Sequence, residues 1–205
     1  MNRIPTTLVD RRNDEIVPAV LIDGVTVELV EQTEDHWAVP RLQGALRCRQ
    51  SGHSVPEHFH WDWRRKTPKL RLLAYRCFGL ECQGEMQGMM MVNTASYSAR
   101  LAPDQCKPLV YVDYLESAPW NLQGMVAEPR YGAIGTRLFE AAVRFSLSEG
   151  FGGRVGLHAL PQAEDFYGRV CQMARVERDS NVEGLWWFEL TVQKARTFLG
   201  EEGLP

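Results

Sequence analysis

The feature that most constrains the fold is a β-rich run followed by a glycine-containing turn and an amphipathic helix. The run LVYVDYLE spans residues 109–116, and the turn R-Y-G-A-I-G-T spans residues 130–136. The helix that follows carries one apolar stripe, made of Ile134, Leu138, Ala141, Ala142 and Phe145. Glu140 and Arg144 form an exposed i,i+4 pair, and Gly150 is typical of the position just beyond a helix end. This order predicts a layered α/β protein.

The rest of the chain alternates between strand and helix patterns. A hairpin around Asp23-Gly24 is predicted within residues 16–30, and helices are predicted over 34–50 and 56–67, the second ended by Pro68. Apolar runs at 78–82 and 86–93 predict a second hairpin, with its turn at Gln83-Gly84. Strands are expected at 154–160 and 184–191, and a short helix at 192–201. A further helix after Pro161 has an apolar stripe of Ala163, Phe166, Tyr167 and Val170.

The run GMMMV at 88–92 is apolar without alternation, which is typical of a strand buried on both faces. Methionine is an unusual choice for a strand, so a buried helical turn is the alternative. With the strand reading, the element order predicts an α/β fold with a mixed sheet and helices on both faces.

Composition excludes several classes of protein. The chain has 205 residues, 44% of them hydrophobic and 24% charged, which is ordinary for a globular protein with one sizeable core. No run of about 18 apolar residues is present, so no transmembrane helix is expected. The first residues lack the apolar region of a secretory signal, and the five cysteines form no C-x-x-C pair. We therefore expect a cytoplasmic protein with free thiols.

The net charge of −3 hides an uneven distribution. Residues 1–40 carry a balance of −5, residues 41–76 a balance of +7, and residues 77–205 a balance of −5. The overall charge argues against a dedicated nucleic-acid-binding protein, which usually has a basic surplus. The basic segment 41–76 nevertheless leaves open a local interaction with an anionic partner.

The turn at 130–136 has the chemistry of an anion site. Glycines let backbone N–H groups approach an anion, the helix N-terminus adds unpaired N–H groups, and Arg130 adds a charged donor. The alternative is a simple tight connection between a strand and a helix. Neither G-x-G-x-x-G nor G-x-x-x-x-G-K-[ST] is present, so the dinucleotide-binding and P-loop patterns are excluded.

The turn resembles the Q/R-x-x-G-x-G/A motif of the GCN5-related N-acetyltransferases (GNAT). Arg130 occupies the first position of the motif and Gly135 the last, while Ala133 replaces the middle glycine and Gly132 lies one place earlier. In this family the motif binds the pyrophosphate of acetyl-CoA. The resemblance therefore implies a cofactor site made of Arg130, Tyr131, Gly132, Ala133, Ile134, Gly135 and Thr136.

A second match follows in the next predicted helix. The family places a tyrosine in the next helix, in a pattern like A-x-x-x-Y-x-x-x-G-F, and this chain has Ala163-x-x-x-Tyr167 followed by Cys171-Gln172-Met173 in place of Gly-Phe. The resemblance covers about 78–191. It implies a single acetyltransferase-like domain over 1–205, with a core at about 70–191, N-terminal strands and helices at 1–69, and a mixed, mostly antiparallel central sheet with helices on both faces.

The resemblance implies an N-acetyltransferase that moves an acetyl group from acetyl-CoA directly to an amine, without a metal. Tyr167 is then the candidate acid for the departing thiolate, and Glu116 the candidate base. The alternatives are a core aromatic and an ordinary strand-end carboxylate. Asp113 lies on the opposite strand face from Glu116, and His158 is a second candidate base.

Two stretches are candidates for the acceptor side, 116–121 and 58–63. Their Trp61, Trp63 and Trp120 offer flat surfaces for packing or for cation–π contact with an amine. Between Glu116 and Arg130 lie thirteen residues, more than the family usually has, so the cofactor-contacting edge could instead lie near Met125–Val126. A zinc site is a rival reading of Cys48, His53, His58 and His60, although their spacing matches no common finger.

Two other functions remain open from the sequence. One is a non-catalytic domain of the same fold that binds CoA or a partner protein. The other is an acetyltransferase that acts on an amine linked to a nucleic acid, recruited by the basic segment 41–76. The resembling family often forms homodimers, and no membrane association is expected.

Overall fold

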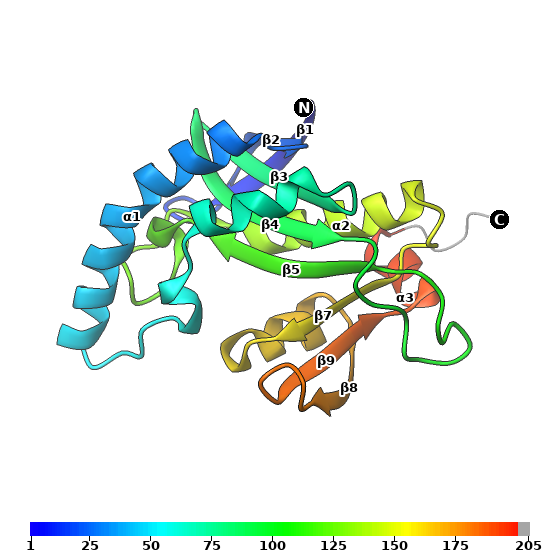
Figure 1. Cartoon of the computed structure of the whole chain (residues 1–205). Helices are drawn as coiled ribbons and strands as arrows, with labels where there is room; N and C mark the ends of the chain where they lie inside the picture. Colours follow the sequence, from blue (N-terminus) through cyan, green and yellow to red (C-terminus); the bar gives the residue numbers. More distant parts are fainter. Residues whose placement is uncertain (201–205) are drawn as a thin grey trace. The chain divides into compact units, whose positions relative to one another are not determined.

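The computed structural model describes residues 1–200 (Figure 1). Within them the chain forms two compact units. Unit 1 comprises residues 1–90 and 115–138, and unit 2 comprises residues 91–114 and the chain from 139 onward. The strands of the sheet follow one another in the order β6 (Tyr131–Gly132), β1 (Asn2–Asp10), β2 (Glu15–Asp23), β3 (Tyr75–Cys82), β4 (Glu85–Asn93), β5 (Val110–Ser117), β7 (Val155–Ala159), β9 (Leu185–Leu190) and β8 (Ala174–Asp179). Strands β5 and β7 are parallel, whereas β1–β2, β1–β6, β2–β3, β7–β9 and β8–β9 are antiparallel. The predicted mixed, mostly antiparallel α/β fold is confirmed.

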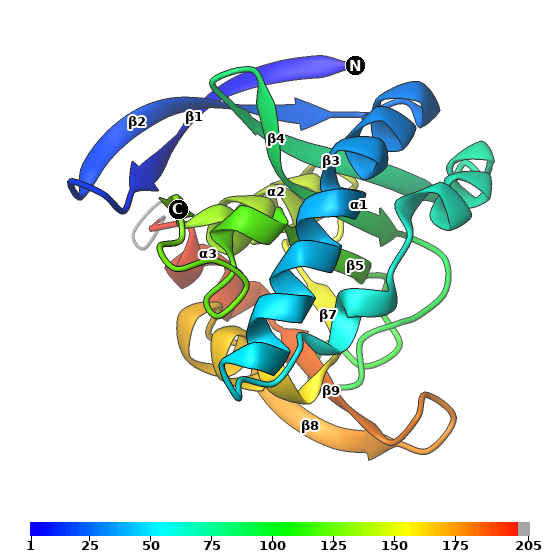
Figure 2. The same cartoon turned by 90° about the vertical axis from the view of Figure 1, so that its left-hand side faces the viewer.

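Unit 1 begins with a long hairpin, drawn in dark blue in Figures 1 and 2, of β1 (Asn2–Asp10) and β2 (Glu15–Asp23). The predicted hairpin around Asp23-Gly24 is therefore wrong. Gly24, with φ of +80°, leads into a helix instead, because the Thr26 side chain accepts a hydrogen bond from the Leu29 N–H and caps the first turn. The β-branched residues at 25–27 look like a strand, but the cap decides the local structure.

Helix α1 (Val27–Gln50) includes the whole predicted helix 34–50. Its Trp37 is fully buried and donates through Nε1 to the Met86 carbonyl at 3.2 Å, which ties the helix to β4. The predicted helix 56–67 is two 3-10 helices, η1 (Glu57–His60) and η2 (Trp63–Arg71). Pro68 lies inside η2 rather than ending it.

The hairpin predicted at Gln83-Gly84 is confirmed as β3 (Tyr75–Cys82) and β4 (Glu85–Asn93). Both turn residues have positive φ, 53° and 77°, which a tight two-residue hairpin requires. In β4, residues 89–92 are fully buried, so the methionine run is a strand, as expected from its lack of alternation. Unit 1 also contains η3 (Pro119–Asn121) and the two-residue strand β6 (Tyr131–Gly132).

The other strands predicted from 109 onward are confirmed. They are β5 (Val110–Ser117), β7 (Val155–Ala159) and β9 (Leu185–Leu190). Helix α2 (Ile134–Ser148) has the predicted stripe, with Leu138 and Ala142 fully buried, and Arg144 pairs with Glu140 at 3.0 Å. Strands β1 and β8 (Ala174–Asp179) were not predicted, because both are mostly exposed and lack a clear apolar alternation.

The predicted helix after Pro161 is a 3-10 turn, η4 (Pro161–Ala163), and a π-helical turn, η5 (Phe166–Val170). Its predicted stripe is only partly right, since Tyr167 is buried but Val170 is 49% exposed. The tail forms α3 (Val192–Phe198), and residue 201 of the predicted tail helix lies outside the described residues. In residues 1–200 no helix combines the length and the apolar character needed to cross a membrane.

Candidate functional site

The backbone of the predicted cofactor turn is held from two directions in unit 1. Tyr131 and Gly132 pair with Asp10 and Val9 of β1, and the Arg11 N–H donates to the Arg130 carbonyl at 3.0 Å. The Tyr131 N–H donates to Asn121 Oδ1 at 2.9 Å. The first half of the turn is therefore a strand fixed by the N-terminal hairpin, which the sequence did not predict.

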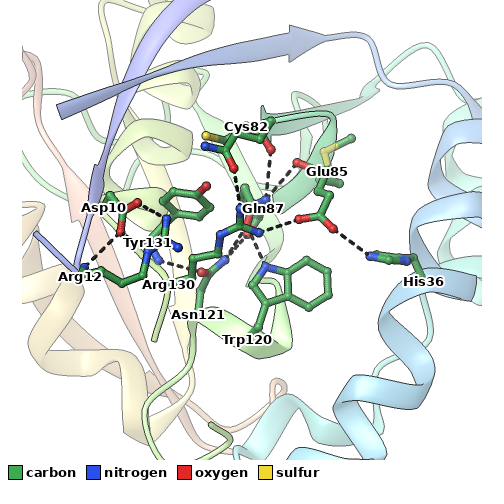
Figure 3. Close-up of polar contacts among 12 residues, drawn as sticks. Asp10, Arg12, His36, Cys82, Glu85, Gln87, Trp120, Asn121, Arg130 and Tyr131 are labelled. Carbon is green, nitrogen blue, oxygen red and sulfur yellow. Dashed lines mark hydrogen bonds and ion pairs between the residues drawn. The ribbon is translucent and has the colours of Figure 1, made fainter. Parts of the chain in front are cut away.

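The Arg130 side chain is also engaged. Its guanidinium donates through Nη1 to Glu85 Oε2 at 2.8 Å and through Nη2 to Gln83 Oε1 at 2.5 Å. Figure 3 shows the Glu85 carboxylate between Arg130 and His36, whose Nε2 lies 3.8 Å from Glu85. Arg130 would have to exchange these partners in order to bind a phosphate group directly.

The second half of the turn has the geometry of an anion site. Ala133 has φ of +66°, the left-handed region that glycine enters freely and that costs other residues about 1–2 kcal/mol. Helix α2 begins immediately after it, and the N–H groups of its first turn have no intrahelical acceptors. Ile134, Gly135 and Thr136 could therefore hold a phosphate at the positive end of the helix dipole. The glycine that the family has at position 133 would relieve the backbone strain.

An open cleft of about 430 Å³ lies beside Arg130 in unit 1. Figure 3 shows the Trp120 ring at this place, with its Nε1 donating to Gln87 Oε1 at 2.9 Å, and Asn121 donating to the same oxygen. Of the three candidate tryptophans, the one after β5 therefore does line a cleft. The residues around the cleft are Arg12, His36, Pro40, Glu85, Trp120, Val126, Glu128 and Arg130.

Glu116, the candidate base, lies near the end of β5 and is only 2% exposed. Its carboxyl accepts a hydrogen bond of 2.6 Å from Trp63 Nε1, and its other oxygen lies 3.3 Å from Arg41 Nη2. Burial raises the pKa of Glu116 from its ordinary 4.5 to about 7, although Arg41 and Trp63 oppose the shift. A carboxyl that titrates near neutral pH is suited to accept a proton in catalysis.

Sequence reasoning missed the partners of Glu116. Arg41 forms two hydrogen bonds with Glu34, at 2.6 and 3.1 Å, and Glu34 Oε2 also accepts from the Trp63 backbone N–H at 3.1 Å. Lys66 is buried nearby, with its Nζ 5.0 and 5.5 Å from the ring centres of Trp61 and Trp63. A signal existed for two of them, because positions 34 and 41 fall on the same helical stripe as the buried Trp37.

Tyr167, the candidate acid, is buried in unit 2 among aromatic rings. The ring centres of Phe166, Phe139 and Phe188 lie 5.1, 6.2 and 6.3 Å from its own. Burial raises the pKa of its hydroxyl well above the ordinary value of 10, so the group is protonated at neutral pH. Such a hydroxyl can donate a proton, and the same environment fits a core aromatic.

The second candidate base, His158, belongs to a separate polar network in unit 2. Its Nδ1 lies 2.9 Å from the Tyr111 hydroxyl, and its Nε2 lies 3.3 Å from Asp179 Oδ2. Asp179 also accepts from Arg100 at 2.7 Å, and this hydrogen bond is the main reason that its pKa falls to about 2. Desolvation lowers the pKa of His158. Asp113 accepts a hydrogen bond from Asn93 Nδ2 at 3.1 Å.

The zinc reading finds no geometric support. Within residues 1–200 no three or more His, Cys, Asp or Glu side chains are grouped so that they could hold a metal ion. All five cysteines are free thiols, and four of them are buried. The free-thiol prediction is confirmed.

Comparison by sequence, with protein-family models and with curated proteins, found no match. Comparison with solved structures found many. A GNAT-family acetyltransferase from Listeria monocytogenes is 10% identical, with a TM-score of 0.54, over 92% of this chain and 99% of that one. An acetyltransferase from Thermus thermophilus is 18% identical, with a TM-score of 0.50, over 83% and 96%. An N-acyl amino acid synthase from uncultured soil microbes is 12% identical, with a TM-score of 0.51, over 87% and 94%.

These similarities extend over most of the chain and almost all of each compared protein. At 18% identity or less they concern the fold. The chain therefore has the fold of the GCN5-related N-acetyltransferases, as its two motifs predicted.

Proposed function

We propose that this chain is an acetyl-CoA-dependent N-acetyltransferase that transfers the acetyl group directly to an amine. The observation that carries the proposal is the buried Glu116 carboxyl, whose pKa of about 7 suits a general base, at the end of a strand in a GNAT fold. Direct transfer needs both substrates held together, and this positioning supplies much of the rate gain.

In this mechanism acetyl-CoA supplies the thioester. The first-turn N–H groups of α2, at Ile134 to Thr136, hold the pyrophosphate, and Arg130 adds a charged donor after it leaves Glu85. A backbone N–H of β5 polarises the thioester carbonyl. No metal has a role in these steps.

Two side chains move the protons. Glu116 takes a proton from the acceptor ammonium, directly or through a water molecule, and leaves a neutral amine to attack the carbonyl carbon. As the C–N bond forms, the C–S bond breaks and the Tyr167 hydroxyl protonates the thiolate. The Tyr167 hydroxyl is protonated at neutral pH, as a proton donor must be, although burial makes it a weaker acid than an ordinary tyrosine.

The first test is ligand binding. Acetyl-CoA and CoA, but not NADH, should raise the melting temperature of the protein, because a ligand that binds only the folded state stabilises it. If neither acetyl-CoA nor CoA shifted the melting temperature at millimolar concentration, the proposal would be wrong. The Tyr167→Phe variant should keep this shift and lose thiol release, whereas unchanged turnover would remove Tyr167 from the mechanism.

A non-catalytic CoA-binding or partner-binding domain is the second candidate. It is favoured by the engaged Arg130 side chain and by the strained Ala133, both of which weaken phosphate binding. A melting-temperature shift with acetyl-CoA, without thiol release for any amine, would support this candidate over the enzyme.

The nucleic-acid alternative loses support from the ion pairs of the basic segment 41–76. Arg41 pairs with Glu34 and Glu116, Arg64 with Asp35, and Arg76 with Asp23. All of these acids lie outside the segment. They neutralise much of the positive charge of residues 41–76, which leaves less of it to attract an anionic partner. Weak, salt-insensitive RNA binding is the expected result.

A further inference from the structure

The turn proposed to hold the cofactor contains one backbone conformation that alanine disfavours. Ala133 has φ of +66°, and its carbonyl accepts a hydrogen bond of 3.0 Å from the Arg137 N–H, in the first turn of α2. Glycine enters this left-handed region freely, whereas a Cβ makes the region unfavourable. A residue in such a conformation persists only where its surroundings fix the backbone around it. The α2 hydrogen bond fixes the chain after Ala133, so the chain before it must be held as well.

The chain before Ala133 is held by the side chain of Asn121, which is only 6% exposed. Asn121 Oδ1 accepts a hydrogen bond from the Tyr131 N–H at 2.9 Å. The Arg130 N–H donates to the carbonyl of the adjacent Trp120 at 3.2 Å. Because β1 also pairs with β6, two elements far apart in the sequence hold the backbone that leads into Ala133.

Asn121 is itself fixed by the side-chain amide of Gln87, a fully buried residue of β4. Gln87 Oε1 accepts hydrogen bonds from Asn121 Nδ2 and from Trp120 Nε1, both at 2.9 Å. Gln87 Nε2 donates to the carbonyls of Cys82 and Glu85, at 3.4 and 3.2 Å. Figure 3 shows these contacts meeting at Gln87. Since both polar atoms of its amide are engaged, Gln87 fixes the orientation of the Asn121 side chain.

We propose that Asn121 is a positioning residue for the cofactor turn, and that with Gln87 it forms a clamp that holds Ala133 at positive φ. The inference rests on the proposed function. In this role Asn121 contacts no substrate atom and acts through the backbone of Tyr131. Without the clamp, Ala133 would favour negative φ, and only the remaining fraction of molecules would present the first-turn N–H groups of α2 in the geometry that binds the pyrophosphate.

The direct test is the affinity of the full chain for acetyl-CoA and for CoA, measured by titration calorimetry. Asn121→Ala should raise both dissociation constants by at least about 5-fold, because the preference of alanine for negative φ reduces the binding-competent population by about that factor. KM for acetyl-CoA should rise with the dissociation constant, while kcat at saturating acetyl-CoA should change by less than about 2-fold, since Glu116 is untouched. A rise of less than about 5-fold in the dissociation constants would overturn the inference.

The matched control is Asn93→Ala, at the other end of β4. Asn93 is also buried, its Oδ1 also accepts a backbone N–H, from Ser96 at 3.0 Å, and its Nδ2 also donates to a side chain, that of Asp113 at 3.1 Å. Both variants should have a lower melting temperature than the wild type, but only Asn121→Ala should lose affinity for acetyl-CoA. An equal loss of affinity in both variants would reflect lower stability alone and would overturn the positioning role.

A second background tests whether the clamp acts through Ala133. In a protein that already carries Ala133→Gly, the Asn121→Ala substitution should raise the dissociation constant for acetyl-CoA by no more than about 2-fold. The reason is that glycine populates positive φ about as readily as negative φ, so the turn no longer depends on the clamp. The difference between the two backgrounds measures the coupling between the two positions. An equal loss of affinity in both backgrounds would show that Asn121 does not act through Ala133.

The outcomes separate this inference from the proposed function. If the unmodified protein bound neither acetyl-CoA nor CoA, both would be wrong. If it bound them and Asn121→Ala bound them equally well, the inference would be wrong and the acetyltransferase would stand. If Asn121→Ala does not fold, amide hydrogen exchange on the unmodified protein decides. Without ligand, the Tyr131 N–H should exchange much more slowly than an exposed amide, and fast exchange would contradict the clamp.

Discussion

Among the described residues, a buried polar network in unit 1 and a partly buried one in unit 2 differ in how completely their donors and acceptors are paired. In unit 1, Glu116 contacts Trp63 and Arg41, its pKa is raised to about 7, and Arg41 Nε has no hydrogen-bond partner within residues 1–200. In unit 2, the Tyr111 hydroxyl, the two nitrogens of His158 and the Asp179 carboxylate form a continuous chain.

The electrostatic consequences are opposite. Asp179 is surrounded by donors, since Arg100 and the Asn181 N–H both bind it, and its pKa falls to about 2. Desolvation dominates at Glu116, and its pKa rises. A network in which every donor and acceptor is paired stabilises the fold. A network that contains a group with a strongly shifted pKa and a donor without an acceptor is a candidate for binding or catalysis.

The largest expected effect is on catalysis at the first network. Glu116→Gln should lower acetyl transfer by about 10²–10⁴-fold, because the proton acceptor is lost while the shape of the side chain is kept. Thiol release at saturating acetyl-CoA measures it. The matched control is Glu177→Gln, which alters an exposed partner of Arg100 and should leave turnover unchanged. If Glu116→Gln were as active as the wild type, the catalytic role assigned to the unit 1 network would be wrong.

The next effect is on stability at the second network. Tyr111→Phe removes the hydroxyl that faces His158 Nδ1 and leaves a buried nitrogen unpaired, which should cost about 1–3 kcal/mol of unfolding free energy. Urea unfolding measures the cost. Thiol release should not change, and in a His158→Gln background the same substitution should cost less. A loss of turnover with unchanged stability would reverse the assignment of the two networks.

The two networks should also respond to pH in opposite directions. A raised pKa in the folded state means that Glu116 binds its proton more tightly there, so its contribution to stability falls as pH rises from 4.5 to about 7. The lowered pKa of Asp179 gives stability above about 3.8 that is lost as pH falls toward 2. The unfolding free energy of the wild type minus that of Glu116→Gln should therefore fall as pH rises from 4.5 to about 7. The unfolding free energy of the wild type minus that of Asp179→Asn should rise as pH rises from about 2 to 3.8.

The smallest effect concerns the hydrogen bond from Trp63 to Glu116. This bond favours the ionised carboxylate, so Trp63→Phe should raise the pH midpoint of the reaction rate by about one unit. Arg41, Lys66 and Glu34 also face Glu116 and remain in this variant. Trp61→Phe, which alters a ring beside Lys66, is the control and should leave the midpoint in place. A midpoint that does not move would show that Trp63 only packs there.

Local sequence patterns predicted the elements that depend on neighbouring residues. The Gln83-Gly84 dipeptide correctly predicted the β3–β4 hairpin, and the apolar stripe from Ile134 to Phe145 correctly predicted α2. Both succeeded because turn geometry and helical periodicity are set within a few residues. The same local reasoning misread residues 24–30 as a strand, since the Thr26 cap is a single hydrogen bond within a β-branched run. Strand β1 was missed because most of its residues are exposed and show no clear apolar alternation.

The candidate site shows the same division. Tyr167 was named from its place in a motif and Glu116 from its place at the end of a predicted strand, and the structure buries both. Their chemical environment was not accessible from the sequence. Lys66 and Arg41 lie 50 and 75 residues before Glu116, and nothing in their spacing predicts that they meet.

The sequence alone determined the turn and helix at 130–148, the strands β3, β4, β5, β7 and β9, and the charge excess of segment 41–76. Only the tertiary structure decided what that excess means, by pairing Arg41, Arg64 and Arg76 with acids from elsewhere in the chain and by burying Lys66. The physical reason is that periodicity and turn geometry are local, whereas burial and the partner of a charge depend on segments far apart in the sequence.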